Sequence, residues 1–110
     1  MKPTQQQKDN KLIAEFMGLT IITDNISYFD TNYKPLKNYH NDWNWLMEVV
    51  EKIENLSKEG ETYMFSITKF SARVTYKGSR IVDLPIDNTK IEAVYNACIE
   101  FIVWYNENKI

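Results

Sequence analysis

The fold is decided by residues 62–84, which read TYMFSITKFSARVTYKGSRIVDL. Apolar and polar side chains alternate along 62–68 and again along 72–77, with the two-residue period of a half-buried strand. Gly78-Ser79 then forms a two-residue turn into a third run, 80–84. Because each run pairs with its neighbour in sequence, this stretch predicts a three-stranded antiparallel meander.

The register of the third strand is left open by the sequence. A turn at Gly78-Ser79 places Asp83 opposite Val74, on the face that the apolar side chains occupy. A carboxylate on that face is costly unless it is hydrated or paired. We therefore expect either a β-bulge that shifts the register or a sheet edge that is open to water.

Three other stretches carry apolar residues at helical spacing, and each has a signal for one of its ends. The first ends at Gly18, the second is capped by Asn41 or Asp42, and the third opens with the capping box of Thr89 and Glu92. The apolar stripes are Leu12, Ile13, Phe16 and Met17; Leu46, Val49, Val50, Ile53 and Leu56; and Ile91, Val94, Cys98, Phe101 and Tyr105.

Residues 19–29 hold two short strand-like runs on either side of Asp24-Asn25, which predict a hairpin. Residues 30–40 show neither period and are expected to form a surface loop. One domain over residues 1–110 follows, with helix, hairpin, helix, meander and helix in that order. We expect an α+β fold in which about five antiparallel strands form one sheet with three helices packed on it.

The amino-acid composition argues against several classes of protein. The chain carries 13 Lys+Arg and 15 Asp+Glu, and this balance argues against a polycation and against a strongly acidic mimic of DNA. A single cysteine, Cys98, excludes an internal disulfide and a multi-cysteine zinc site. The sequence shows no signal-peptide region, and its longest apolar run, 101–105, is too short to cross a bilayer. A cytoplasmic protein that does not contact membranes is expected.

Three blocks of the sequence carry a family resemblance: NKLIAEFMG (10–18), YHNDWNWLMEVVEKIE (39–54) and KIEAVYNACIEFIVWYNENK (90–109). They resemble small proteins from phages and prophages of Bacteroidetes-type bacteria, akin to the phage ABA-sandwich domain. The resemblance implies a phage or prophage origin and an α/β/α sandwich with helices on both faces of the sheet. Members often have Trp-Asp-Trp-Leu-Met-Pro where this chain has Trp-Asn-Trp-Leu-Met-Glu at 43–48. The resemblance brings no catalytic residues and no cofactor.

His40 is the only histidine, and with Asp42 and Asp30 it offers the one hypothesis of an acid/base or metal site. Zinc normally takes three or four protein ligands, and the chain has neither a second histidine nor a second cysteine. Asp42 is more simply the cap of the following helix. We therefore expect a protein that is not an enzyme, with no catalytic residue, metal or cofactor.

A fringe of aromatic and apolar side chains lies beside the predicted core stripes. Aromatic residues and Met are enriched at protein interfaces, although flanking tryptophans also seal the rim of a small core. Together with the phage resemblance, the fringe predicts a protein that binds a host protein, such as a CRISPR-type defence nuclease; self-association is a second use of the same residues. The candidate partner-binding residues are Tyr33, Tyr39, Trp43, Trp45, Met47, Val103 and Trp104.

A basic patch supports the alternative hypothesis. Arg73, Lys77 and Arg80 share one face of the predicted meander, with Lys69 and Phe70 nearby. Such a patch can hold phosphates and stack a base, but charged residues also protect exposed sheet faces. Nucleic-acid binding is therefore the second hypothesis, and a helix over that face would weaken it.

Overall fold

The computed structural model describes residues 4–23, 28–29, 36–58, 60–84, 87 and 89–108. Within this part of the chain the fold class is α+β, with three helices and antiparallel strands, as the sequence predicts. No helix among the described residues is long and apolar enough to span a bilayer. The elements are α1 (Gln5–Phe16), β1 (Ile22–Thr23), β2 (Tyr28–Phe29), α2 (Trp43–Asn55), β3 (Ser57–Lys58), β4 (Glu61–Ile67), β5 (Ala72–Tyr76), β6 (Ser79–Leu84) and α3 (Lys90–Asn108).

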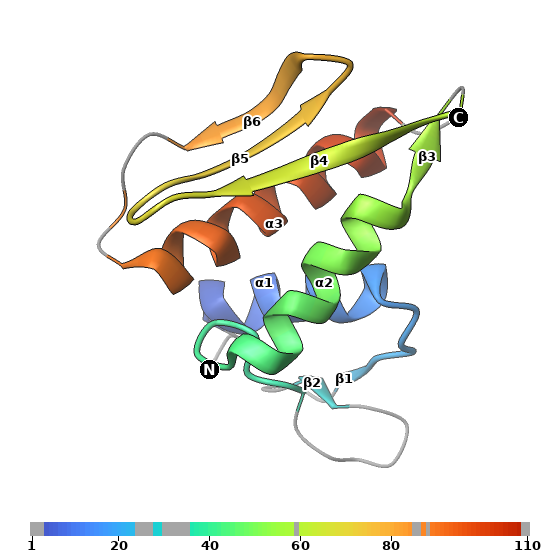
Figure 1. Cartoon of the computed structure of the whole chain (residues 1–110). Helices are drawn as coiled ribbons and strands as arrows, with labels where there is room; N and C mark the ends of the chain where they lie inside the picture. Colours follow the sequence, from blue (N-terminus) through green and yellow to red (C-terminus); the bar gives the residue numbers. More distant parts are fainter. Residues whose placement is uncertain are drawn as a thin grey trace.

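The prediction of one sheet with about five strands is wrong, because the described strands form two sheets. The meander β4, β5 and β6 is the body of the main sheet, and the two-residue β3 extends it beside β4. Among the described strands, β1 and β2 pair only with each other, and Figure 1 shows this ribbon at the opposite end of the molecule from the main sheet. Each ribbon strand has two described residues, and the helices lie between the ribbon and the main sheet. The expected turn Asp24-Asn25 lies outside the described residues.

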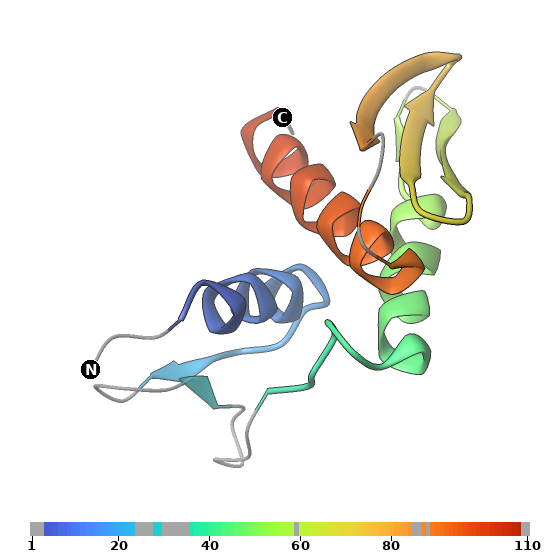
Figure 2. The same cartoon turned by 90° about the vertical axis from the view of Figure 1, so that its left-hand side faces the viewer.

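Helices α2 and α3 pack on the same face of the main sheet, where α2 contacts β4 and α3 contacts β5 and β6. Helix α1 packs mainly against α3, so that α3 lies between α1 and the sheet (Figure 2). This arrangement differs from a sandwich with helices on both sheet faces. Among the described residues no helix covers the outer face of the sheet, on which Met64 is 64% exposed.

A β-bulge in β6 sets the register of the meander. Val74 pairs with Val82 rather than with Asp83, because Ile81 is an extra residue without a partner in β5. Asp83 therefore lies opposite Arg73 on the outer face, while Ile81 and Val82 pack against the core. Of the two alternatives that the sequence leaves open, a bulge or a sheet edge open to water, the structure has the bulge. It pairs the apolar Val74 with Val82 and the guanidinium of Arg73 with the carboxylate of Asp83.

The hairpin turn between β5 and β6 lies one residue earlier than predicted. Tyr76 pairs with Ser79, so the two turn residues are Lys77 and Gly78 rather than Gly78 and Ser79. Their φ angles are +51° and +80°, and positive φ at both central residues is the mark of a type I′ turn. This turn suits the right-handed twist of the strands, which explains why a lysine adopts a left-handed conformation here.

The ends of the helices follow the sequence signals. Asp42 caps α2 by accepting hydrogen bonds from the backbone N–H groups of Asn44 and Trp45, at 2.9 and 3.2 Å. Thr89 accepts from the N–H of Glu92 at 3.2 Å at the start of α3. The α1 cap, a reciprocal pair between Thr4 and Gln7, has the same logic.

The core lies between the main sheet and α2 and α3, and continues between α3 and α1. Most predicted stripe residues are buried there, and Cys98 is fully buried at the centre of α3, as predicted. Burial raises the pKa of its thiol, which therefore behaves as a small apolar group. The fully buried stripe residues are Ile13, Leu46, Val49, Ile53, Val94, Cys98 and Phe101.

Candidate functional site

An apolar groove of about 340 Å³ lies between the edge strand β6 and the C-terminal half of α3. It contains two of the predicted partner-binding residues, Val103 and Trp104. Val103 is 44% exposed, although α3 is otherwise the most buried helix of the fold. The full lining is Ile81, Val82, Ile99, Glu100, Val103, Trp104 and Glu107.

Trp104 is held in the groove wall by aromatic neighbours from the core. Its ring packs edge-on against Tyr63 of β4, with centroids 6.0 Å apart, and beside Phe101 at 5.8 Å. Tyr63 is 3% exposed and Phe101 is fully buried, so both are fixed by packing. Burial raises the pKa of the Tyr63 hydroxyl, and the nearby Tyr105 raises it further. Trp104 therefore presents a rigid apolar surface to the groove.

Two carboxylates flank Val103 on α3. Glu100 and Glu107 lie seven residues apart in sequence, which is about two helical turns or 10 Å along the axis. Both are exposed and both line the groove. Within the described ranges neither carboxylate forms an ion pair or a hydrogen bond. The groove thus has an apolar floor and an acidic rim.

The structure does not bring all the predicted partner-binding residues together. Trp43 and Met47 are 39% and 37% exposed near the start of α2, and the half-buried Trp45 lies under the ammonium of Lys37 at 5.7 Å. Figure 1 shows that the start of α2 and the end of α3 lie far apart. Tyr39 is 1% exposed and belongs to the core, which corrects its placement beside the core. Tyr33 lies outside the described residues.

The predicted basic patch is partly neutralised. Asp83 forms ion pairs with Arg73 at 3.3 Å and with Arg80 at 2.8 Å on the outer sheet face. The hydrogen bond from Arg73, with the charges of both guanidinium groups, lowers the pKa of Asp83. The ammonium groups of the two lysines lie over aromatic rings, Lys69 over Phe70 and Lys77 over Tyr76. One carboxylate therefore forms ion pairs with both arginines. The register expected from the sequence places Asp83 opposite Val74 and so does not predict these ion pairs.

The side chains of His40 and Asp42 have different hydrogen-bond partners. Asp42 caps α2, whereas Nδ1 of His40 lies 3.2 Å from the amide nitrogen of Asn10 in α1. The amide oxygen of Asn10 accepts a hydrogen bond from the hydroxyl of Tyr95 at 2.9 Å. Burial raises the pKa of Tyr95. Among the described residues no group of three or more His, Cys, Asp and Glu side chains is placed to hold a metal.

The buried Asn10 is not among the residues predicted from the sequence, although its position in α1 indicates its role. It is a polar residue on the apolar face of α1, one turn before Ile13 and Ala14, and it is only 6% exposed. A buried amide needs hydrogen-bond partners, and the residues that supply them are 30 and 85 positions away in the chain.

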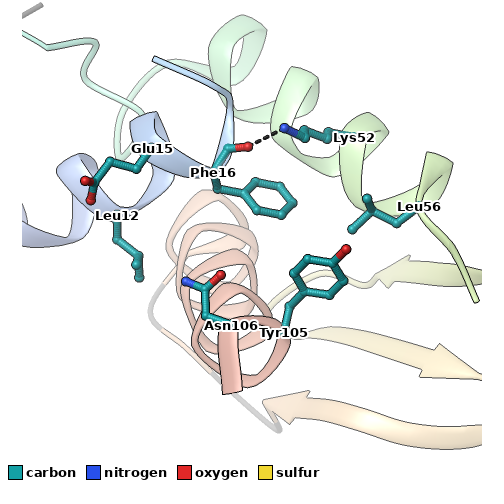
Figure 3. Close-up of a pocket in the computed structure, with 7 residues that line it drawn as sticks. All are labelled: Leu12, Glu15, Phe16, Lys52, Leu56, Tyr105 and Asn106. Carbon is teal, nitrogen blue, oxygen red and sulfur yellow. Dashed lines mark hydrogen bonds between the residues drawn. The ribbon is translucent and has the colours of Figure 1, made fainter. Parts of the chain in front are cut away.

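A second hollow, of about 490 Å³, lies where the C-terminal ends of the three helices meet (Figure 3). The ammonium of Lys52 donates a hydrogen bond to the backbone carbonyl of Phe16 and lies 4.8 Å from the centre of its ring. Lys52 thereby binds the last carbonyl of α1, where a cation is favoured. Figure 3 shows the lining residues Leu12, Glu15, Phe16, Lys52, Leu56, Tyr105 and Asn106 around this contact. The lysine acts here as a link between α1 and α2.

Comparisons of the chain with known protein families, with curated proteins and with solved structures give no match. The phage-family resemblance therefore stays an expectation from the three sequence blocks.

Proposed function

We propose that this protein acts without catalysis, by binding another protein through the groove between β6 and α3. The observation that carries the proposal is the exposure of Val103 beside the rigid wall formed by Trp104. Single exposed apolar side chains are common on protein surfaces, but Val103 continues an apolar groove with Ile81 and Ile99, and contiguous apolar surface favours a role in binding. Fixed aromatic walls in concave apolar surfaces are typical of binding hot spots.

The non-enzymatic part of the proposal is supported by the engagement of the histidine and the aspartate. Nδ1 of His40 contacts the amide of Asn10 and Asp42 accepts from the first turn of α2, so each member of the acid/base pair that the sequence suggested has another partner. The buried Cys98 is remote from solvent. A nucleophile needs access to a substrate, and the fully buried thiol of Cys98 lacks it.

The target in this proposal is a host protein in the bacterial cytoplasm, as the phage resemblance implies. A defence nuclease of the CRISPR type is the first target to test, and inhibition would follow if the groove occupied a surface that the nuclease needs. The groove itself supports protein binding, and the phage resemblance supports the choice of host.

The proposal is tested by affinity capture from host lysate with three baits: the wild type, Val103→Glu and Met64→Glu. Met64 is the matched control, because it is more exposed than Val103 and lies on the outer face of the sheet. We expect a protein that is retained after nuclease treatment by the wild type and Met64→Glu but lost with Val103→Glu. Equal retention by all three baits would remove the groove from the proposal.

The same experiment addresses nucleic-acid binding, which one observation favours. The outer sheet face is uncovered among the described residues, so Arg73 and Arg80 are accessible there. Against it, Asp83 offsets their charge, and the aromatic rings of β4 and β5 pack toward the core rather than on this face. A partner that is lost on nuclease treatment would support this alternative.

A further inference from the structure

We infer that the groove receives a basic amphipathic helix of the partner, with an apolar stripe and two Lys or Arg residues spaced seven apart. This inference rests on the proposed function and names the chemistry of the partner. It is carried by the acidic rim of the groove, by the position of Glu107 in α3 and by the bulge in β6.

The charge pattern fits a helix lying along α3. Glu100 and Glu107 stand about two turns apart with Val103 between them, all three on the side that lines the groove. A partner helix of the same pitch places cations at positions i and i+7 opposite the two carboxylates. Its apolar residues at i+3 and i+4 then meet Val103 and the groove floor. An uncharged or acidic segment would leave both carboxylates unpaired at the edge of an apolar contact, which is costly.

Glu107 is placed where the fold alone would not favour it. It lies in the last turn of α3, at the negative end of the helix dipole, and that turn contains no basic residue. A carboxylate at this position destabilises a helix slightly, whereas Lys, Arg or a neutral side chain would not. A residue that opposes the local preference of its helix is best explained by a contact outside the fold.

The bulge in β6 favours a helix over an added strand as the occupant. Strand addition needs a regular edge with evenly presented backbone N–H and C=O groups. Ile81 interrupts this regularity in the middle of the edge strand and turns its own side chain into the groove. The edge therefore offers side-chain contacts to a helix rather than a template for a strand.

A second copy of the chain is a poor occupant of this groove. In a twofold contact the same surface meets itself, so that Glu100 of one copy approaches Glu107 of the other. Like charges at both ends of the contact oppose it. The rim thus selects against self-association through Val103 and in favour of a basic partner.

The test uses two fluorescein-labelled helical peptides with the same Leu and Ala stripe, one with Lys and the other with Glu at two positions seven apart. Fluorescence anisotropy measures the Kd of each peptide for the full chain. We expect the wild type to prefer the Lys peptide by about tenfold, from two ion pairs at the edge of an apolar contact. The charge-reversed variant Glu100→Lys/Glu107→Lys should prefer the Glu peptide instead.

The matched control is Glu51→Lys/Glu54→Lys, which reverses two exposed carboxylates on α2, away from the groove. It changes the net charge by the same amount and should keep the wild-type preference. Equal binding of the two peptides, binding of neither, or the same response in both double variants would overturn the inference. If Val103→Glu still released a captured partner in that case, protein binding through the groove would stand and only the basic helix would be wrong.

Discussion

The hydroxyl of Tyr95 in α3 donates a hydrogen bond of 2.9 Å to the amide oxygen of Asn10 in α1, although the two residues lie 85 positions apart. Tyr95 is 7% exposed and Asn10 is 6% exposed, so this bond is buried. The amide nitrogen of Asn10 faces His40, which carries the network to the segment before α2. One buried amide therefore ties the helix that packs outermost, α1, to the rest of the fold.

The Asn10–Tyr95 bond predicts a non-additive pair of substitutions. Asn10→Leu or Tyr95→Phe alone should lower the free energy of unfolding by about 1–3 kcal/mol, because each leaves a buried polar group without its partner. The double variant should cost less than the sum of the two, since both polar groups are then removed. Urea denaturation of the four proteins measures this cycle. Additive costs would show that the bond itself contributes little.

Lys77 predicts a substitution that increases stability. Its φ of +51° is a left-handed conformation that a lysine adopts at a cost and that asparagine tolerates better. Lys77→Asn creates the Asn-Gly pair preferred in type I′ turns and should raise the free energy of unfolding by about 0.5–1 kcal/mol. Lys77→Ala is the control for the loss of the ammonium over the Tyr76 ring and should not raise stability. A gain in the alanine variant equal to that in the asparagine variant would contradict the turn argument.

The ion pairs of Asp83 predict a contribution to stability that depends on pH. Arg73 and Arg80 lower its pKa below the usual value of 3.8 in the folded state, so the stabilisation is present above that value. It is lost as pH falls through the lower pKa of the folded protein. Thermal unfolding should therefore show that the advantage of the wild type over Asp83→Asn shrinks between about pH 5 and pH 2. A constant difference across that range would mean that the charge of Asp83 is not what stabilises the sheet.

Asp83 also provides a test of nucleic-acid binding. If the outer sheet face bound phosphates, removing the carboxylate in Asp83→Asn would free both arginines and tighten binding, and Arg73→Glu would weaken it. We expect neither change with a labelled single-stranded oligonucleotide in anisotropy titrations at several salt concentrations. A clear ranking of Asp83→Asn above the wild type and Arg73→Glu, with a steep salt dependence, would instead favour the basic face.

The helices and the three meander strands were predictable because their signals are local. Asp42 and Thr89 are capping residues at the starts of periodic stretches, and the stripe around Cys98 is apolar by any measure. The meander needs only its alternation and one short turn. These are interactions between residues that are close in sequence, which a single sequence records directly.

The remaining features depend on choices that the sequence does not record locally. Moving the turn from Gly78-Ser79 to Lys77-Gly78 changes the partner of Asp83 but not its face, and the bulge at Ile81 is the step that transfers Asp83 to the outer face. The shift of the turn alone leaves the aspartate on the apolar side, so the face of Asp83 depends on the bulge. The groove depends on the same bulge, because the extra residue Ile81 lines it. Val103 and Trp104 lie on a helix that the sequence predicts and were named as binding residues. Ile81 was not named, because the sequence does not fix the bulge.

Glu107 provides the sharpest test of the groove, because its effects on folding and on binding have opposite signs. Glu107→Gln removes a negative charge from the C-terminal turn of α3 and should raise the free energy of unfolding by about 0.3–1 kcal/mol. The same change should weaken binding of the Lys peptide by about two- to fivefold, because one of the two ion pairs is lost. Glu100→Gln is the control: it lies in the middle of α3, where the dipole has little effect, so it should weaken binding without a gain in stability. Denaturation and anisotropy on the same samples measure both effects. A variant at position 107 that gains stability and keeps its affinity would show that the carboxylate contributes nothing to partner recognition.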